Sequence, residues 1–253
     1  MKTEVLAISR LGEQTFNKTL KSVLFEDEVK DTVIEFFSMS GVHKIEASPS
    51  SVYFDVLLAL KGEGVLRLKR DDYRINTSNV IRIPYNKPYG IYVEEGTEFH
   101  FLRIRRFLNH KDIQAIELNQ NESQALYIRA LSECQVYMED IKSARTINRM
   151  VLPEGLVPRF AMGSVETEGP DEVGEHCHPM LDQLFLGLSS CNCICYADDE
   201  QTILSENMLL HIPLGSRHAV SVSKGNTLAY IWMDFFLTQE GEKYMGEQHQ
   251  MEQ

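Results

Sequence analysis

Apolar residues along this chain recur in short runs separated by turn residues, a pattern that predicts β-strands rather than helices. In the first half, apolar or alternating runs lie at 52–61, 65–69, 80–84 and 98–104, with glycine-containing or acidic turns between them. The second half repeats this rhythm at 184–188, 191–196, 208–213, 218–222 and 228–236. Short strands at such spacing are typical of a β-sandwich or a β-barrel.

The two halves of the chain also match each other in detail. Segments 80–84 and 209–213 both end in Ile-Pro, and each is followed by a polar loop and a ring residue, Tyr89 or His218. An internal duplication explains this match. We therefore expect an all-β protein with two antiparallel jelly-roll barrels, at 1–106 and 146–238. Between them we expect a connector at 107–145 with a helix within 117–140, and after them a polar, frayed tail at 239–253.

Charge and composition exclude several classes of function. The chain has 37 acidic and 25 basic residues, a net charge of -12, which makes nucleic-acid binding an unfavourable main task. No apolar run approaches the roughly 20 residues of a membrane helix, and residues 1–10 contain no apolar stretch typical of a signal peptide. We expect a cytoplasmic protein whose five cysteines are core thiols rather than a disulfide framework.

Chemistry is concentrated between residues 174 and 218. His176 and His178 are separated by one residue, so on a strand both imidazoles point to the same face. His218 follows a turn with Pro213 and Gly215. Two histidines from one strand, a polar side chain on the adjacent strand and a histidine after a turn can converge on one metal ion.

These residues resemble the two sequence motifs of the cupin superfamily. The first motif is His-x-His followed after three or four residues by Glu, and the second runs from a Gly through Pro-x-Gly to a final His. His176 and His178 match the first motif, and Pro213, Gly215 and His218 match the second. Asn207 stands in place of the first Gly, a mild departure because Asn tolerates a left-handed turn.

The motif glutamate is absent. A spacing of four residues puts Gln183 in its place, and a spacing of three puts Asp182 there. Strand alternation favours Gln183, because it shares a face with Phe185 and Gly187 and leaves Asp182 at the mouth of the strand. The resemblance thus implies one divalent transition metal ion, Fe, Mn, Ni or Zn, held by His176, His178, Gln183 and His218.

The resemblance leaves two classes of function open. The first is a metal-dependent enzyme of the dioxygenase or isomerase type, acting on a small oxygen-rich or anionic molecule, with Asp182 and Glu175 as weak candidates for a catalytic base. The second is a non-catalytic module that binds a metal or a sugar. Cupin proteins include both, so the motif predicts the fold more sharply than the reaction.

The first half resembles a cupin barrel without its metal ligands. Asp55 occupies the place of the motif glutamate and Tyr89 that of the final histidine, while 48–51 contains no histidine. We expect this barrel to be metal-free and structural. A structural barrel, together with the apolar run at 33–37, suggests a homodimer.

Overall fold

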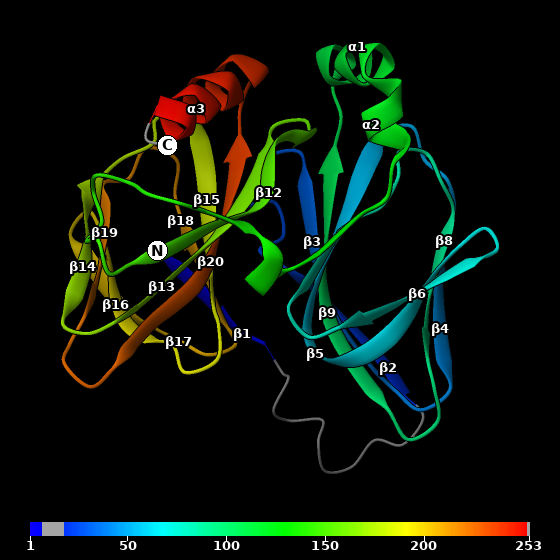
Figure 1. Ribbon diagram of the computed structural model, residues 1–253, viewed down its shortest axis with the longest axis horizontal. Coiled ribbons are helices and arrows are strands. Elements are labelled where there is room, and N and C mark those ends of the chain that lie inside the picture. Colours follow the sequence, from blue (N-terminus) through cyan, green and yellow to red (C-terminus); the bar gives the residue numbers. More distant parts are fainter. Residues whose placement is uncertain (7–17, 252–253) are drawn as a thin grey trace. The chain divides into compact units, whose positions relative to one another are not determined.

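The computed structural model describes residues 1–6 and 18–251 and divides the chain into two compact units. One unit is Ala7–Glu133, and the other combines Met1–Leu6 with Cys134–Gln253 (Figure 1). Every paired strand within each sheet is antiparallel, as the all-β prediction required. The division lies between Glu133 and Cys134, so the segment 107–145, expected as a separate connector, is shared between the two units.

The N-terminal unit is a two-layered β-barrel. One wall has the strand order β10-β7-β5-β9-β3-β2, and the other wall is built by β4, β8, β6 and the second half of β5. The strands are β2 (Lys18–Leu24), β3 (Thr32–Ser40), β4 (His43–Ala47), β5 (Tyr53–Leu68), β6 (Asp71–Asn76), β7 (Asn79–Arg82), β8 (Tyr89–Val93), β9 (Glu98–Phe107) and β10 (Tyr127–Ala130).

The long strand β5 belongs to both walls because it bends near Gly62. Its pairing with β9 shifts register between Ala59 and Lys61, and Gly62 has a φ of 77°. A Cβ at Gly62 would lie 1.9 Å from the carbonyl oxygen of Glu98, so only glycine fits this bend. The bend lets one strand close the barrel around a core that includes Phe99, Phe101 and their neighbours.

The helical part of the connector begins earlier than predicted. Helix α1 is His110–Leu118 and α2 is Gln120–Gln124, and a 3-10 turn follows β10 at Leu131–Glu133. Asn109 and Asp112 form a reciprocal capping box that starts α1. The expected helix within 117–140 is confirmed in part: α2 lies in that range, whereas Tyr127–Ala130 pairs with β7 as an edge strand.

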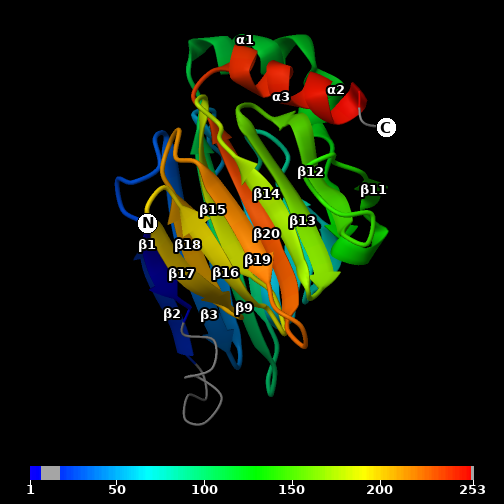
Figure 2. The same ribbon diagram turned by 90° about the vertical axis from the view of Figure 1, so that its left-hand side faces the viewer.

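The C-terminal unit is a second barrel with two facing sheets. Its larger sheet has the order β1-β18-β15-β20-β13-β12-β11, and its smaller sheet the order β14-β19-β16-β17 (Figure 2). The strands are β1 (Lys2–Val5), β11 (Gln135–Tyr137), β12 (Ile147–Val157), β13 (Phe160–Glu168), β14 (Asp171–His176), β15 (Leu181–Gly187), β16 (Asn192–Ala197), β17 (Glu200–Ser205), β18 (Met208–Ile212), β19 (His218–Val222) and β20 (Thr227–Phe236).

At both ends of the chain, the elements in the structure differ from those predicted. Strand β1 pairs with β18 and therefore belongs to the C-terminal barrel, not to the N-terminal one. The tail expected to fray contains helix α3 (Gln239–Met251), and the last two residues of that tail lie outside the described residues. Glu242 anchors this helix, since its buried carboxylate accepts hydrogen bonds from the backbone N–H groups of Gly155 and Arg159.

Two further expectations concern buried side chains. Cys191, Cys193 and Cys195 lie in the core of the C-terminal barrel as free thiols and Cys134 is buried, as expected, whereas Cys177 is exposed. The apolar run at 33–37 is part of β3, and most of its side chains are buried within the chain itself, so it presents no free surface. Among the described residues, no helix has both the length and the apolar character needed to cross a membrane.

Candidate metal centre

Three histidines converge at the mouth of the C-terminal barrel. Their ring nitrogens lie within 4.8 Å of one another, close enough to share one ion. His176 ends β14 and is paired in register with His218, the first residue of β19, while His178 lies in the loop after β14. The ring centroids of His176 and His218 are 4.2 Å apart, and that of His178 lies 4.9 Å from the first and 5.5 Å from the second.

The local backbone explains why these rings meet. The β14–β19 pairing shifts register between Val173 and His176, and such a bulge re-aims the side chain that follows it. Gly215, with a φ of 76°, allows the tight turn that leads into His218. The N–H of Gly215 donates to the carbonyl oxygen of His178 at 3.3 Å, which ties the two histidine-bearing loops together.

Hydrogen bonds fix which nitrogen of the His176 and His218 rings faces the cluster. Nδ1–H of His176 donates to the carbonyl oxygen of Gly174 at 2.8 Å, and Nδ1–H of His218 donates to that of Ser216 at 3.1 Å. Because a carbonyl only accepts, Nε2 of both rings carries a lone pair. His218 Nε2 is buried and has no hydrogen-bond partner within the described part of the chain. Backbone carbonyls orient metal-binding histidines in this way.

His176 and His218 are held in the neutral form that a metal ligand requires. Burial lowers the pKa of His176. Burial, followed by the proximity of His176, lowers the pKa of His218 to about 4. At neutral pH these rings need not lose a proton before they bind a cation, so protons compete weakly with a metal ion.

Gln183 contributes an amide to the same cavity. It lies on β15 and pairs in register with Asp234 of β20. Its Nε2 donates to Asp234 Oδ1 at 2.7 Å, and its Oε1 is buried without a hydrogen-bond partner among the described residues. Two buried atoms with free lone pairs, His218 Nε2 and Gln183 Oε1, therefore border one cavity, and the donor set fits a divalent transition metal ion.

Asp182 and Glu175, the two weak candidates for a catalytic base, do not line this cavity. Asp182 lies on the opposite face of β15 from Gln183, where its Oδ1 accepts from the N–H of Leu214 at 3.1 Å and lies 3.4 Å from His211 Nε2. It therefore holds the turn that leads to His218. Glu175 is exposed and lies 3.7 Å from the guanidinium of the equally exposed Arg217.

The cavity beside the histidines has a volume of about 130 Å³. Its walls combine aromatic and charged side chains, several of which the sequence reasoning missed: Glu139, Lys142, Phe185, Tyr230, Trp232, Asp234 and Met245. Lys142 and Glu139 are almost completely buried and form an ion pair at 2.7 Å. Nothing in the motifs marks these two, but Asp234 is a single carboxylate in the apolar run 228–236, which is a signal for a buried polar contact.

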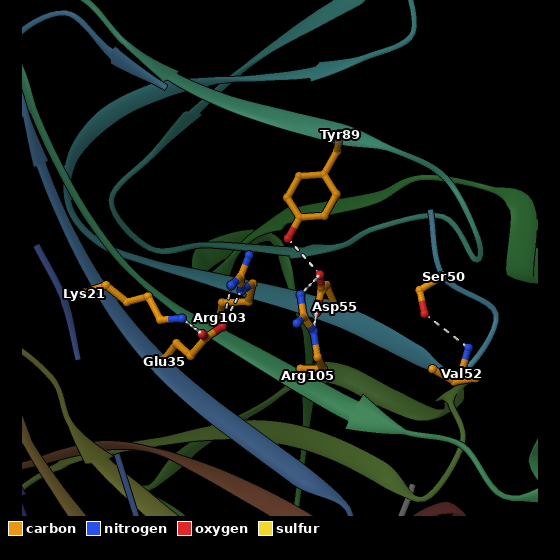
Figure 3. Close-up of polar contacts among 8 residues, drawn as sticks. All are labelled: Lys21, Glu35, Ser50, Val52, Asp55, Tyr89, Arg103 and Arg105. Carbon is orange, nitrogen blue, oxygen red and sulfur yellow. Dashed lines mark hydrogen bonds and ion pairs between the residues drawn. The ribbon is translucent and has the colours of Figure 1, made fainter. Parts of the chain in front are cut away.

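The N-terminal barrel has an ion-pair network where the C-terminal barrel has its histidines. In strand register, Asp55 is opposite Arg105 in the N-terminal barrel, as Gln183 is opposite Asp234 in the C-terminal barrel. Likewise Tyr89 is opposite Ala47, as His218 is opposite His176. Arg105 binds both carboxylate oxygens of Asp55, at 2.9 and 3.1 Å, and the Tyr89 hydroxyl donates to it at 2.8 Å (Figure 3).

A second carboxylate lies beside this network. Glu35 accepts a hydrogen bond from Arg103 Nε at 2.6 Å and also pairs with Lys21 (Figure 3). Among the described residues, no group of three or more His, Cys, Asp or Glu side chains that could hold an ion occurs in this barrel.

Glu35 gives the N-terminal barrel a measurable dependence on pH. Burial by itself raises the pKa of Glu35, but Lys21 and Arg103 together outweigh burial and hold that pKa below its ordinary value of 4.5. The unfolded state therefore binds more protons as the pH falls from 4.5 through the folded-state pKa, and stability is lost in that window. We expect the free energy of unfolding to fall more steeply there for the natural protein than for Glu35→Gln. Equal slopes in urea titrations at several pH values would contradict this role.

Comparison with known proteins identifies the architecture. The sequence matches no protein-family model, and no curated protein is significantly similar to it in sequence. Among solved structures, a cupin 2 conserved barrel domain protein from Leptotrichia buccalis is 15% identical over 93% of this chain and 96% of its own, with a TM-score of 0.64. A putative glyoxylate-induced protein from Pseudomonas aeruginosa is 10% identical over 86% of this chain and 80% of its own, with a TM-score of 0.72.

An enzyme with two barrels also aligns. A deletion variant of oxalate decarboxylase from Bacillus subtilis is 10% identical over 93% of this chain and 79% of its own, with a TM-score of 0.63. At these identities the similarity establishes the fold alone, and the reaction must be inferred from the chemistry of the site.

Proposed function

Because this chain has the two-barrel fold of the cupin superfamily and gathers three histidines beside a cavity, we propose that it is a metal-dependent enzyme of the dioxygenase or isomerase type. The metal is one divalent transition ion, and its ligands are His176, His178, Gln183 and His218. The N-terminal barrel binds no ion and has a structural role.

The observation that carries this proposal is the open side of the histidine cluster. Structural metal sites are closed by protein ligands on all sides, whereas catalytic sites keep a position for water or substrate. Here the buried lone pairs of His218 and Gln183 border a cavity of about 130 Å³ and have no hydrogen-bond partner among the described residues. An ion at this place would keep an open position toward the cavity.

The ligand set and the walls indicate the class of substrate. Three imidazoles and an amide are neutral, so they leave the positive charge of the ion uncompensated and favour an anionic oxygen in the open position. When bound, the metal would act as a Lewis acid on such a group or bind dioxygen beside it. The small cavity limits the substrate to a small molecule, and Phe185 and Trp232 contribute apolar walls. Glu139 and its ion-pair partner Lys142 also line this cavity.

Metal analysis followed by turnover assays tests the proposal. The purified protein should contain about one divalent transition ion per chain. Oxygen consumption and isomer formation should then be followed with a panel of diketones, hydroxy acids and keto sugars. Turnover that disappears on chelation and returns with the ion supports the enzyme. Bound metal without turnover on any of them would overturn it in favour of the non-catalytic binding module.

We also propose that the protein is a homodimer. The apolar run at 33–37 does not support this, because most of its side chains are already buried within the chain. Support comes from β11, an edge strand of the larger C-terminal sheet: Val136 in this strand and Met138 directly after it are each 57% exposed. Light scattering at micromolar concentration decides the matter: a mass near 29.0 kDa refutes the dimer, and twice that mass supports it.

A further inference from the structure

The contact between Gln183 and Asp234 decides which end of the amide faces the cavity. An amide has an oxygen that can bind a cation and an NH₂ group that cannot. Gln183 Nε2 donates to Asp234 Oδ1 at 2.7 Å, so the NH₂ end of the amide faces the carboxyl group. The oxygen is thereby turned away from Asp234 and left without another partner among the described residues.

Burial makes this orientation firm. Gln183 is 5% exposed and Asp234 is 4% exposed, so water does not compete for the contact. The two residues are direct neighbours across β15 and β20, at a separation where side chains on one face of a sheet meet. The flipped amide would place two oxygens against each other.

The equivalent pair in the N-terminal barrel shows the opposite arrangement. There Asp55 takes the position of Gln183, and Arg105 takes that of Asp234. The fork of Arg105 draws both Asp55 oxygens to itself (Figure 3), so that carboxylate is not offered as a ligand. Arg105 on β9 thus binds the oxygens of its neighbour Asp55, whereas Asp234 on β20 accepts from the NH₂ group of its neighbour Gln183 and leaves the amide oxygen unbound by it.

We propose that Asp234 is a positioning residue that holds the Gln183 amide with its oxygen toward the metal and thereby sets the affinity of the site. The inference rests on the proposed function, since it takes Gln183 as the fourth ligand. In Asp234→Asn the new amide can donate to Gln183 Oε1, which lets the glutamine flip and present its NH₂ group to the ion.

A double-mutant cycle tests this coupling with Zn(II) alone. Zn(II) affinity is measured by competition with a chromophoric chelator for the natural protein, Asp234→Asn, Gln183→Ala and the double variant. We expect Asp234→Asn to weaken binding about 10–100-fold, as loss of an outer partner of a ligand does. In the Gln183→Ala background, it should have no further effect. An equal loss in both backgrounds, or no loss in either, would overturn the proposal.

The Gln183→Glu background gives a second, independent reading. A carboxylate offers oxygen at both ends, and beside Asp234 it meets a like charge. Here Asp234→Asn should strengthen Zn(II) binding or leave it unchanged, the reverse of its effect beside glutamine; a loss would contradict the proposal. This comparison also decides the question if Asp234→Asn alone does not fold, which thermal unfolding will show.

Controls separate the two levels of the argument. Glu35→Gln removes a buried carboxylate from the other barrel and should leave Zn(II) affinity unchanged. If Gln183→Ala itself binds Zn(II) as tightly as the natural protein, the proposed ligand set fails and the role of Asp234 fails with it. If Gln183→Ala weakens binding but Asp234→Asn does not, only the positioning role is wrong.

Discussion

Replacing His176 by alanine is expected to abolish metal binding, whereas replacing Asp55 by alanine should leave the metal content unchanged. His176 is one of only three imidazoles that face each other in the described part of the chain, and the remaining protein donors cannot enclose an ion on that side. The loss should exceed the 10–100-fold that removal of an outer partner costs. Asp55 lies in the other barrel, where Arg105 and Tyr89 already occupy its oxygens.

Elemental analysis of the two purified variants, after reconstitution with Mn(II), Fe(II), Ni(II) or Zn(II) and desalting, measures this difference. His218→Ala serves as a second test, because its ring has a buried Nε2 without a partner in the described structure. Metal retained in both histidine variants would show that the ion binds elsewhere. Metal lost from Asp55→Ala would show that the assignment of the metal-free barrel is wrong.

The same Asp55→Ala substitution should have a large effect of another kind, on stability. It leaves the guanidinium of Arg105 without its carboxylate, although that side chain is only 20% exposed. It also removes the acceptor of the buried Tyr89 hydroxyl, whose pKa burial and the Asp55 charge raise well above its ordinary value. Removing one partner of a buried ion pair costs about 3–5 kcal/mol. Because Arg105 is partly exposed, we expect the free energy of unfolding to fall by about 3 kcal/mol, the lower end of this range.

Urea unfolding followed by circular dichroism gives the free energy for this comparison. The matched control is the double variant Asp55→Leu with Arg105→Met, which replaces the pair by apolar side chains of similar size. Such replacements are often neutral or stabilising, so the double variant should recover most of the loss. A single variant as stable as the natural protein would mean that the network contributes nothing to folding.

Much of the fold and part of the site follow from local rules. Strand rhythm and Ile-Pro turns predicted two barrels, because the period-two pattern of a strand is written directly in the sequence. Motif spacing singled out the three histidines that the structure brings within 4.8 Å. Alternation favoured Gln183 over Asp182, and the structure has Gln183 at the cavity and Asp182 on the far face of β15. Asn207, with a φ of 61°, indeed replaces a glycine in a left-handed turn.

The remainder depends on contacts between segments that are distant in sequence. Glu139 and Lys142 reach the cavity because Lys142 bridges to Val173, a pairing that no local pattern announces. Helix α3 looked like a frayed tail because its composition is polar, yet Glu242 satisfies two backbone N–H groups of β12 and the turn after it. Segment 127–130 contains residues compatible with a helix, and pairing with β7 overrides that preference.

Strand β1 makes the C-terminal barrel discontinuous along the chain. Its partner β18 is synthesised about two hundred residues later, after the whole N-terminal unit has left the ribosome. The first strand must therefore wait, while the unit between can already fold. A fragment that begins at Cys134 would lack β1 and expose the edge of β18, and exposed strand edges promote aggregation. Rearranging the gene so that residues 1–6 follow β20 would convert this delayed, long-range closure into a local one.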